Sequence, residues 1–532
     1  MHDYVRKILG ARVYDVAVDS PLDSMPRLSK RLGNSILLKR EDLQPVFSFK
    51  LRGAYNKMAG LSREMLDRGV ICASAGNHAQ GVALSARRLN TQSTIVMPCA
   101  TPEIKVEAVR ARGGNVVLFG DNFDEAYAHA RKLEAEKGLV FIHPYDDPDV
   151  IAGQGTIGME ILSRHPDSID AIFVPVGGGG LAAGIAVYTK FLRPNVKVIG
   201  VEPEEAACMQ AAMRAGKRVV LDQVGFFADG AAVRQAGEET FRLCRQYLDD
   251  IITVSTDEVC SAIKDIFEDT RAIPEPAGAL SLAGLKKYAE EHRLSGRTFV
   301  AINSGANMDF DRLRHISERA EIGEHREALL AVTIPEHPGS YRRFIQLLGR
   351  RSITEFNYRY ADNRAAHIFV GVRLSGGETE KQQIISMLQD NGYAVIDMSN
   401  NEMAKLHVRY MVGGRVAGLD NEVVLRFQFP ERPGALIQFL DSLSDRWNIS
   451  LFHYRNHGAD YGRVLAGIDV PPEERADLKA SLESLSYPYW DETENPAYRS
   501  FLADSNGNGN GAAAKPSAQV GSRTTKPKRA AR

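Results

Sequence analysis

Apolar runs rich in β-branched residues alternate with longer amphipathic stretches across residues 35–320 of this chain. Such alternation is typical of βαβ units on a mostly parallel sheet, so it restricts this part of the chain to an α/β architecture. Strand candidates lie at residues 36–38, 70–72, 93–97, 116–118, 171–176, 196–201 and 298–302, and helix-like segments at 79–88, 103–111 and 123–136. Ligands of such sheets bind at the carboxyl ends of the strands, so functional residues are expected in the loops that follow them.

A second pattern, beyond residue 328, occurs twice in the same order. The first copy has an apolar run at 330–334, Pro335-Glu-His-Pro-Gly-Ser340 before a helix-like run, and strand candidates at 356–359 and 368–372. The second copy has the corresponding segments at 423–429, Pro430-Glu-Arg-Pro-Gly-Ala435, 452–455 and 464–468. Four matched elements predict a tandem duplication of a small α+β module of βαββαβ type.

The length of 532 residues exceeds one ordinary core and predicts several domains. We expect an α/β domain over residues 1–320 and two α+β modules at 328–400 and 421–494. Residues 505–532 are basic and rich in Asn, Gly, Ala and Ser, which predicts a disordered tail.

Charge and cysteine usage exclude several classes of protein. A net charge of -1 offers no basic surface for nucleic acid or acidic lipid. We find no uninterrupted apolar run of about 18 residues, so no membrane span is expected. Five scattered cysteines without a C-x-x-C pair favour a reducing cytoplasm and argue against a disulfide framework or a metal site.

Lys50 stands between apolar residues at the start of a helix-like stretch. By itself, a lysine in that position is most simply a solvated helix-start residue. Phe47, Phe49 and Leu51 would shield its amine from water, however, and burial lowers a lysine pKa below its usual value of about 10.4. The neutral amine is the form that makes a Schiff base with an aldehyde.

The loop Ser74-Ala-Gly76-Asn77-His78 follows a strand candidate and opens a helix. Backbone N–H groups at a helix N-terminus suit a carboxylate. Simple capping of that helix is the alternative, with Asn77 as a turn residue and His78 satisfied locally. Ser, Gly, Asn and His together exceed what a cap needs, which favours substrate binding.

Four consecutive glycines, Gly177 to Gly180, and Leu181 connect another strand candidate to a helix. Successive N–H groups of such a loop can cradle a phosphate. The run also fits a dinucleotide fingerprint, with Glu202 placed as a ribose-binding acid, so this loop alone leaves NAD open. A P-loop is excluded because no Gly-Lys-Ser/Thr closes the run.

Ser304 ends the last strand candidate of the α/β part. Its hydroxyl could hold a heterocyclic nitrogen through one hydrogen bond. A helix N-cap is the alternative and, for this residue in isolation, the better interpretation.

Together these loops resemble those of the fold-type II pyridoxal-phosphate enzymes, and more closely those of the biosynthetic threonine dehydratases (threonine ammonia-lyases). The likeness spans roughly residues 5–500, because the duplicated part resembles the paired ACT-like regulatory modules of that family. It implies pyridoxal 5'-phosphate bound to Lys50 as an aldimine, with Asn77 on the ring hydroxyl, Gly177, Gly178, Gly179, Gly180 and Leu181 on the phosphate, and Ser304 on the pyridine nitrogen. Ser74, Gly76, Asn77 and His78 would then hold the substrate carboxylate.

The resemblance also implies a lyase that converts L-threonine to 2-oxobutanoate and ammonia, the first committed step of isoleucine biosynthesis. It implies inhibition by isoleucine, opposition by valine, and a cytoplasmic homotetramer. Loops at Gly339 and Gly434 precede helix-like runs and could meet an effector carboxylate; ordinary turns in modules used only for assembly are the alternative.

Three rival interpretations stay open on the sequence. Serine dehydratase or serine racemase would use the same loops, and the paired modules favour the feedback-controlled enzyme. An NAD-dependent oxidoreductase would leave Lys50, the Ser74 loop and Ser304 unexplained. A non-catalytic amino-acid sensor would not need a complete cofactor site.

Overall fold

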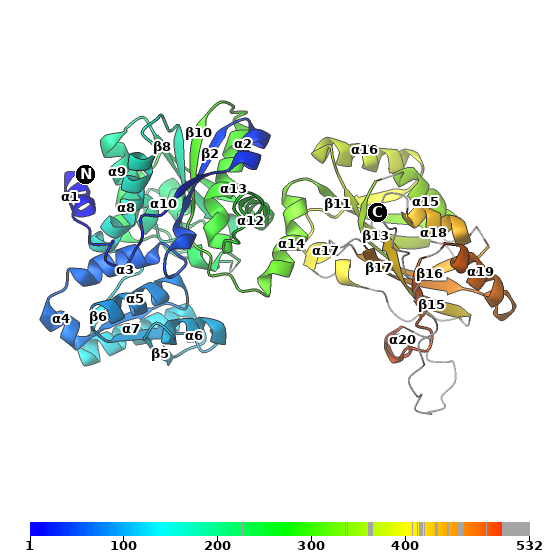
Figure 1. Ribbon diagram of the computed structural model, residues 1–532, viewed down its shortest axis with the longest axis horizontal. Coiled ribbons are helices and arrows are strands. Elements are labelled where there is room, and N and C mark those ends of the chain that lie inside the picture. The colour runs from blue at the N-terminus through cyan, green and yellow to red at the C-terminus, as the bar shows by residue number, and fades with distance from the viewer. Residues whose placement is uncertain are drawn as a thin grey trace, which may run out of the picture. The chain divides into compact units, whose positions relative to one another are not determined.

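The computed structural model describes residues 1–502 with short gaps, and it divides into two compact units at Arg326/Glu327 (Figure 1). The gaps are residues 226, 336, 338, 350, 360–364, 407, 412, 414, 415, 417, 418, 420, 431–434, 444, 445, 456–460 and 486. The predicted tail at 505–532 and Gly434 therefore lie outside the described residues. Within the described ranges, no helix is both long and apolar enough to cross a bilayer.

The first unit contains a six-stranded sheet with strand order β1-β2-β10-β7-β8-β9. β1 pairs antiparallel with β2, and all other neighbours in this sheet are parallel. The strands are β1 (Leu22–Ser24), β2 (Ser35–Arg40), β7 (Ala171–Pro175), β8 (Lys197–Pro203), β9 (Asp250–Val254) and β10 (Thr298–Asn303).

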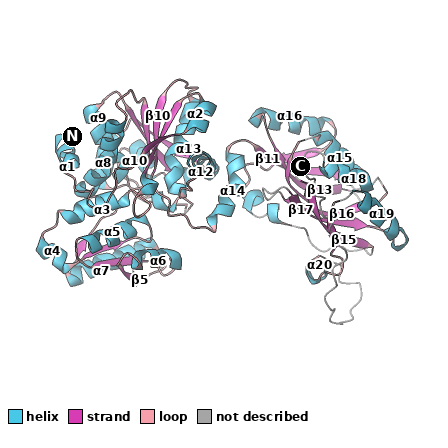
Figure 2. Cartoon of the chain, viewed as in Figure 1, coloured by secondary structure: helices cyan, strands magenta, loops and turns pink. Residues whose placement is uncertain are grey.

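Helices cover both faces of this sheet (Figure 2). Ile172 and Val174 of β7 enter a core shared with α8 and α9, whereas Phe173 enters a second core shared with α12 and α13. Burial on both faces explains why the strands read as continuous apolar runs. The helices are α1 (His2–Leu9), α2 (Pro26–Leu32), α8 (Pro148–Arg164), α9 (Gly180–Leu192), α10 (Cys208–Ala215), α11 (Glu238–Tyr247), α12 (Thr256–Thr270), α13 (Pro276–Glu291) and α14 (Arg312–Gly323).

A smaller, fully parallel sheet of strand order β5-β4-β3-β6 completes the first unit. Its strands are β3 (Val70–Ala73), β4 (Ser93–Met97), β5 (Asn115–Leu118) and β6 (Val140–Phe141). The accompanying helices are α3 (Lys50–Ala59), α4 (Arg63–Arg68), α5 (Asn77–Arg88), α6 (Glu103–Arg110) and α7 (Phe123–Lys137). Two α/β subdomains, each with a mainly parallel sheet, confirm the predicted architecture of this half.

The second unit contains one eight-stranded antiparallel sheet of order β14-β11-β13-β12-β16-β17-β15-β18. The first copy of the repeat supplies β11 (Glu327–Pro335), α15 (Ser340–Leu348), β12 (Ile353–Arg359), β13 (Ala365–Arg373), α16 (Gly377–Asp390) and β14 (Ala394–Asp397). The second copy supplies β15 (Glu422–Pro430), α18 (Ala435–Leu443), β16 (Asn448–Arg455), β17 (Tyr461–Asp469), α19 (Arg475–Leu485) and β18 (Tyr489–Asp491). Each copy has the predicted βαββαβ order; α17 (Glu402–Leu406) lies between the copies, and α20 (Pro496–Phe501) follows the second.

The two copies join edge to edge through β12 and β16. Phe356 pairs with Tyr454 and Tyr358 with Phe452 in an antiparallel register, so the two sheets become one. Phe356 and Phe452 also meet edge-on with ring centroids 5.8 Å apart inside a single core. Pairing of the two inner strands removes two sheet edges that would otherwise be open to other chains.

Candidate active site

One cavity of the first unit gathers residues from four separate loops, from the start of α3 and from α8 and α13. Lys50, the whole glycine loop and Ser304 all line it. The further lining residues are Phe49, Pro144, Tyr145, Gln154, Pro175, Gly230, Ala231 and Ala277. The cavity lies beyond the carboxyl ends of β7 and β10, the edge where ligands bind in parallel sheets.

Backbone bonds between two distant segments bring Lys50 and Ser304 together. The N–H of Phe49 donates to the Ser304 carbonyl at 3.2 Å, and Ser48 forms an isolated antiparallel bridge with Gly305. Helix α3 can then cross α8 closely, because Gly53 faces Gly153: a Cβ added at Gly153 would lie 2.7 Å from the Gly53 Cα. The position of Lys50 is thus set by the packing around it.

Lys50 is the first residue of α3, and it is half-buried where it lines the cavity. Burial lowers the pKa of Lys50 to about 8, with the Glu275 carboxylate acting in the opposite direction. Within the part of the chain that the structure describes, the Lys50 ammonium has no ion-pair partner, and it lies 5.6 Å from the centroid of the Phe49 ring. Phe47 shields the amine less than predicted, because its own side chain is 51% exposed.

The glycine loop is packed too tightly for side chains. Gly179 has φ +96°, a left-handed conformation that favours glycine, and it precedes the first turn of α9. A Cβ at Gly178 would lie 2.3 Å from the Tyr145 ring, and one at Gly177 would lie 3.0 Å from Ala231. Four residues without side chains therefore line the cavity here and lead into the N-terminus of α9, where the helix dipole is positive.

Ser304 follows β10 and is buried in the cavity wall. Its hydroxyl donates to the Ala277 carbonyl at 3.2 Å. The N-cap interpretation is wrong, because the next helix, α14, begins only at Arg312. A hydroxyl can rotate toward a ligand acceptor.

The polar residues of the loop before α5 have different hydrogen-bond partners. Asn77 is buried at the first position of α5, where its amide nitrogen donates to Glu275 at 2.5 Å. His78 faces the interior: its Nε2 lies 2.9 Å from the Ile142 carbonyl, and burial, with smaller contributions from Lys50 and His143, lowers its pKa to about 3. Ser74 accepts a bond from the Gly76 N–H at 3.3 Å, and a Cβ at Gly76 would meet nothing within 4 Å. The loop thus leaves open space at Gly76.

Glu202 does not point to a ribose. It is fully buried on β8, and its two carboxylate oxygens accept the N–H groups of Met209 and Gln210 at 2.8 Å each. It therefore satisfies the first turn of α10. This removes the acid on which the NAD interpretation depended.

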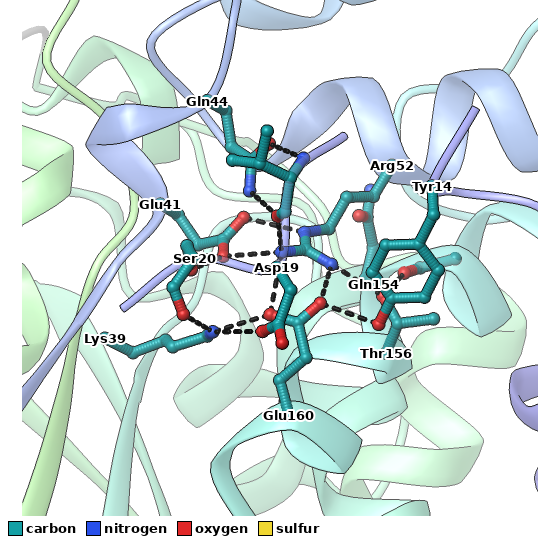
Figure 3. Close-up of polar contacts among 12 residues, drawn as sticks. Tyr14, Asp19, Ser20, Lys39, Glu41, Gln44, Arg52, Gln154, Thr156 and Glu160 are labelled. Atoms are coloured by element: carbon teal, nitrogen blue, oxygen red, sulfur yellow. Dashed lines mark hydrogen bonds and ion pairs between the residues drawn. The ribbon is translucent and has the colours of Figure 1, made fainter. Parts of the chain in front are cut away.

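A buried ionic cluster fixes α3 just beyond Lys50 (Figure 3). The Arg52 guanidinium contacts Glu41 at 2.7 Å and Glu160 at 2.5 Å, and the Lys39 ammonium contacts Glu160 at 2.5 Å. Arg52, Glu41 and Lys39 are fully buried, and Glu160 is nearly so. Ser20 donates to Glu41 at 2.5 Å and Tyr14 to Glu160 at 2.8 Å, so the N-terminal segment is held as well.

Comparisons with known proteins agree with this geometry. Residues 14–305 match the family described as "Pyridoxal-phosphate dependent enzyme", and residues 318–408 and 413–502 each match "C-terminal regulatory domain of Threonine dehydratase". "L-threonine dehydratase biosynthetic IlvA" of Burkholderia multivorans is 57% identical over 505 residues, which cover 94% of this chain and 99% of that protein. The protein of the same name in Escherichia coli is 58% identical over 501 residues, or 94% and 97% of the two chains.

Solved structures show the same relationship for the first unit. The processed form of threonine deaminase isoform 2 from Solanum lycopersicum is 53% identical with a TM-score of 0.59, covering 60% of this chain and 93% of that one. Maize serine racemase is 30% identical with a TM-score of 0.56, covering 61% and 98%. The first unit alone is therefore similar to both a threonine deaminase and a serine racemase. The match of the second unit to the regulatory domain of threonine dehydratase distinguishes between the two enzymes.

Fold and cavity together define a fold-type II pyridoxal-phosphate enzyme with paired regulatory modules. The matched regions and the identity along nearly the whole chain place it further: the chain belongs to the biosynthetic threonine dehydratases. It is a pyridoxal-phosphate-dependent lyase, not an oxidoreductase or a non-catalytic sensor.

Several site residues carried no signal in the sequence. Tyr145 and Gln154 line the cavity, and Glu275 holds Asn77, yet none of them belongs to a recognisable motif. Gly230 lies in the 3-10 turn η3 (Asp229–Ala231), whose proximity to the site depends on long-range packing.

The buried cluster gives a stability prediction. Arg52→Leu leaves Glu41 and Glu160 as buried carboxylates without their main cation, and we expect a loss of about 3–5 kcal/mol in the free energy of unfolding. Arg63→Leu is the control, because the Arg63–Asp67 pair is 59% and 58% exposed; its loss should be about 0–1 kcal/mol. Thermal unfolding followed by circular dichroism measures both, and equal shifts for the two variants would contradict the assignment.

Proposed function

We propose that the cavity around Lys50 is where the enzyme converts L-threonine to 2-oxobutanoate and ammonia, as the committed step toward isoleucine. The observation that carries this proposal is the convergence of Lys50, the glycine loop and Ser304 on one cavity in a chain of this family. Serine dehydratase or racemase chemistry is the second candidate, supported by the likeness of the first unit to maize serine racemase.

The residues present fit pyridoxal 5'-phosphate. The glycine loop has no room for side chains, because a Cβ at Gly177 or Gly178 would meet Ala231 or Tyr145, and the loop leads into the N-terminus of α9, which suits the phosphate. Lys50 would hold the aldehyde carbon, Asn77 the ring hydroxyl and Ser304 the pyridine nitrogen. When bound, the cofactor supplies an electron sink for the negative charge that develops at the substrate Cα.

The Lys50 amine is suited to remove the proton from the substrate Cα. Because burial lowers its pKa to about 8, about a tenth of the amine is neutral at pH 7, far more than at the usual lysine pKa of about 10.4. A neutral amine beside the substrate Cα can take its proton as a general base, after which the β-hydroxyl leaves as water. Hydrolysis of the resulting enamine, by way of the imine, gives the keto acid and ammonia.

Ser304 would determine how strongly the bound cofactor can withdraw electrons from the substrate. Many pyridoxal enzymes place an acidic residue beside the pyridine nitrogen and hold it protonated. A hydroxyl is neutral and donates only a hydrogen bond, so the nitrogen at this site gains less positive charge. A modest sink suits elimination, which requires only brief storage of charge.

The substrate carboxylate would bind at the loop Ser74–His78. The N-terminus of α5 begins there, and open space surrounds Gly76. His78 contributes through its backbone, since its ring is bonded to the Ile142 carbonyl.

We further infer that isoleucine binds in the second unit as an inhibitor and that valine opposes it. A pocket there is lined by Gly339 and Ser340 at the start of α15, and by the aliphatic side chains Leu440, Leu443 and Ile449. Gly339 has φ +87° and precedes the first turn of a helix, which suits an amino-acid carboxylate. Assembly as a homotetramer and residence in the cytoplasm remain predictions.

The central activity test uses the purified chain loaded with pyridoxal 5'-phosphate. L-Threonine should yield 2-oxobutanoate and ammonia in equal amounts, faster than L-serine yields pyruvate, and isoleucine should lower the rate while valine restores it. Keto-acid release can be followed by a coupled dehydrogenase assay. Faster turnover of L-serine, or racemisation without ammonia, would favour the second candidate.

A substitution at Tyr341 tests the proposed effector pocket. Its hydroxyl is buried in the pocket wall and has no hydrogen-bond partner among the described residues. If the effector supplies that partner, Tyr341→Phe should raise the half-inhibitory isoleucine concentration about five- to tenfold while leaving uninhibited turnover unchanged. Tyr487→Phe is the matched control, because the Tyr487 hydroxyl already donates to Gln438 at 3.0 Å outside the pocket. An equal response of the two variants would place the effector elsewhere.

A further inference from the structure

The amide of Asn77 is held from both sides. Its nitrogen donates to Glu275 Oε1 at 2.5 Å, and its oxygen accepts from Asn307 Nδ2 at 2.6 Å. Asn307 in turn donates to the Val46 carbonyl at 2.8 Å, so its own amide orientation is fixed too. A carboxylate can only accept and the Asn307 nitrogen can only donate, so Asn77 cannot exchange its nitrogen and oxygen. One N–H of Asn77 remains for a further acceptor.

This arrangement lies directly behind the cavity wall. A Cβ added at Gly230, which lines the cavity, would lie 3.4 Å from Glu275 Oε1 and 3.8 Å from Asn77 Nδ2. A Cβ at Gly305, next to the cavity residue Ser304, would lie 2.5 Å from the same Glu275 oxygen. Glycine at position 305 therefore makes room for the Glu275 carboxylate beside Ser304, whereas a side chain at position 230 would only touch that carboxylate.

Glu275 is buried and faces few charges. Those acting on it are Asp229 from η3, Lys105 from α6 and Lys50 from α3. Lys105 is already paired with Asp229 at 2.6 Å, which leaves Lys50 as the unpaired cation of the group. Burial, followed by Asp229, raises the pKa of Glu275 to about 7, against the Asn77 hydrogen bond and the two lysines. The same carboxylate favours the charged form of Lys50.

We propose that Glu275 is a positioning residue for the cofactor, acting in two ways. As a hydrogen-bond acceptor it turns the Asn77 N–H toward the cofactor ring, and as a buried negative charge it sets the pH at which the Lys50 nitrogen gives up its proton. The inference rests on the proposed function, because it assumes that the cofactor occupies this cavity. Glu275→Gln removes the charge, and Asn307→Ala removes the hydrogen bond that holds the Asn77 amide from its other side.

Glu275→Gln removes the charge and keeps an acceptor oxygen of nearly the same shape. In the cofactor-loaded protein, the pH midpoint at which the visible absorbance band shifts should fall by about one unit, the usual effect of losing a neighbouring opposite charge. The cofactor dissociation constant should change less than about threefold, since the hydrogen bond persists. Glu202→Gln is the matched control: Glu202 is equally buried in the same unit, but Lys50 is not among the groups acting on it, so its midpoint should equal that of the unaltered protein.

Asn307→Ala provides the second arm. It removes the donor to the Asn77 oxygen without touching the charge of Glu275, so the cofactor should bind about three- to tenfold more weakly with the midpoint unchanged. This variant also keeps the proposal testable should Glu275→Gln fold poorly.

Two results would overturn the inference: a midpoint for Glu275→Gln that matches the Glu202→Gln control, or an Asn307→Ala protein that binds cofactor as tightly as the unaltered chain. Failure of the underlying function would look different, because the unaltered protein would then show no visible band and release no keto acid from threonine.

Discussion

The buried ion cluster around Arg52 is the constraint on which the catalytic unit depends. Two carboxylates, Glu41 and Glu160, and two cations, Arg52 and Lys39, are removed from water and satisfy one another. Each charge is costly to bury alone, so β2, α3 and α8 can only come together in the arrangement that completes the set. Because α3 begins at Lys50, the cluster also fixes where the catalytic amine enters the cavity.

The contrast between the two lysines explains the chemistry. Lys39 is buried and tied to Glu160 at 2.5 Å, so its proton is needed for structure. Lys50 has no ion-pair partner within the described residues, and burial alone lowers its pKa to about 8. Only the second arrangement leaves an amine free to bind an aldehyde or accept a proton. In the proposed function, the tight glycine loop would hold the phosphate and the neutral Ser304 would give a modest electron sink.

Much of this could be predicted from the sequence. The strands around residues 70, 95, 172 and 300 and the tandem βαββαβ repeat follow from local patterns, and the structure confirms them. Local patterns also predict the functional loops, of which the glycine loop and Ser304 line one cavity with Lys50. The short β6, of only two residues, and the edge strands β1 and β9 carried too weak a pattern to be recognised. Fusion of the two modules into one sheet, the Tyr145 wall and the Glu275–Asn77 bond all depend on contacts between segments far apart in the chain, which local patterns do not encode. For the same reason the shielding by Phe47 and the ribose role weighed for Glu202 were wrong.

The central claim is that the Lys50 amine is the group that binds the cofactor aldehyde. Borohydride reduction of the loaded protein, followed by proteolysis and mass spectrometry, locates the modified lysine directly. The account predicts that the pyridoxyl group lies on the peptide carrying Lys50 and that the ion-paired Lys39 stays unmodified. Modification of Lys39 or another lysine, with Lys50 untouched, would contradict it.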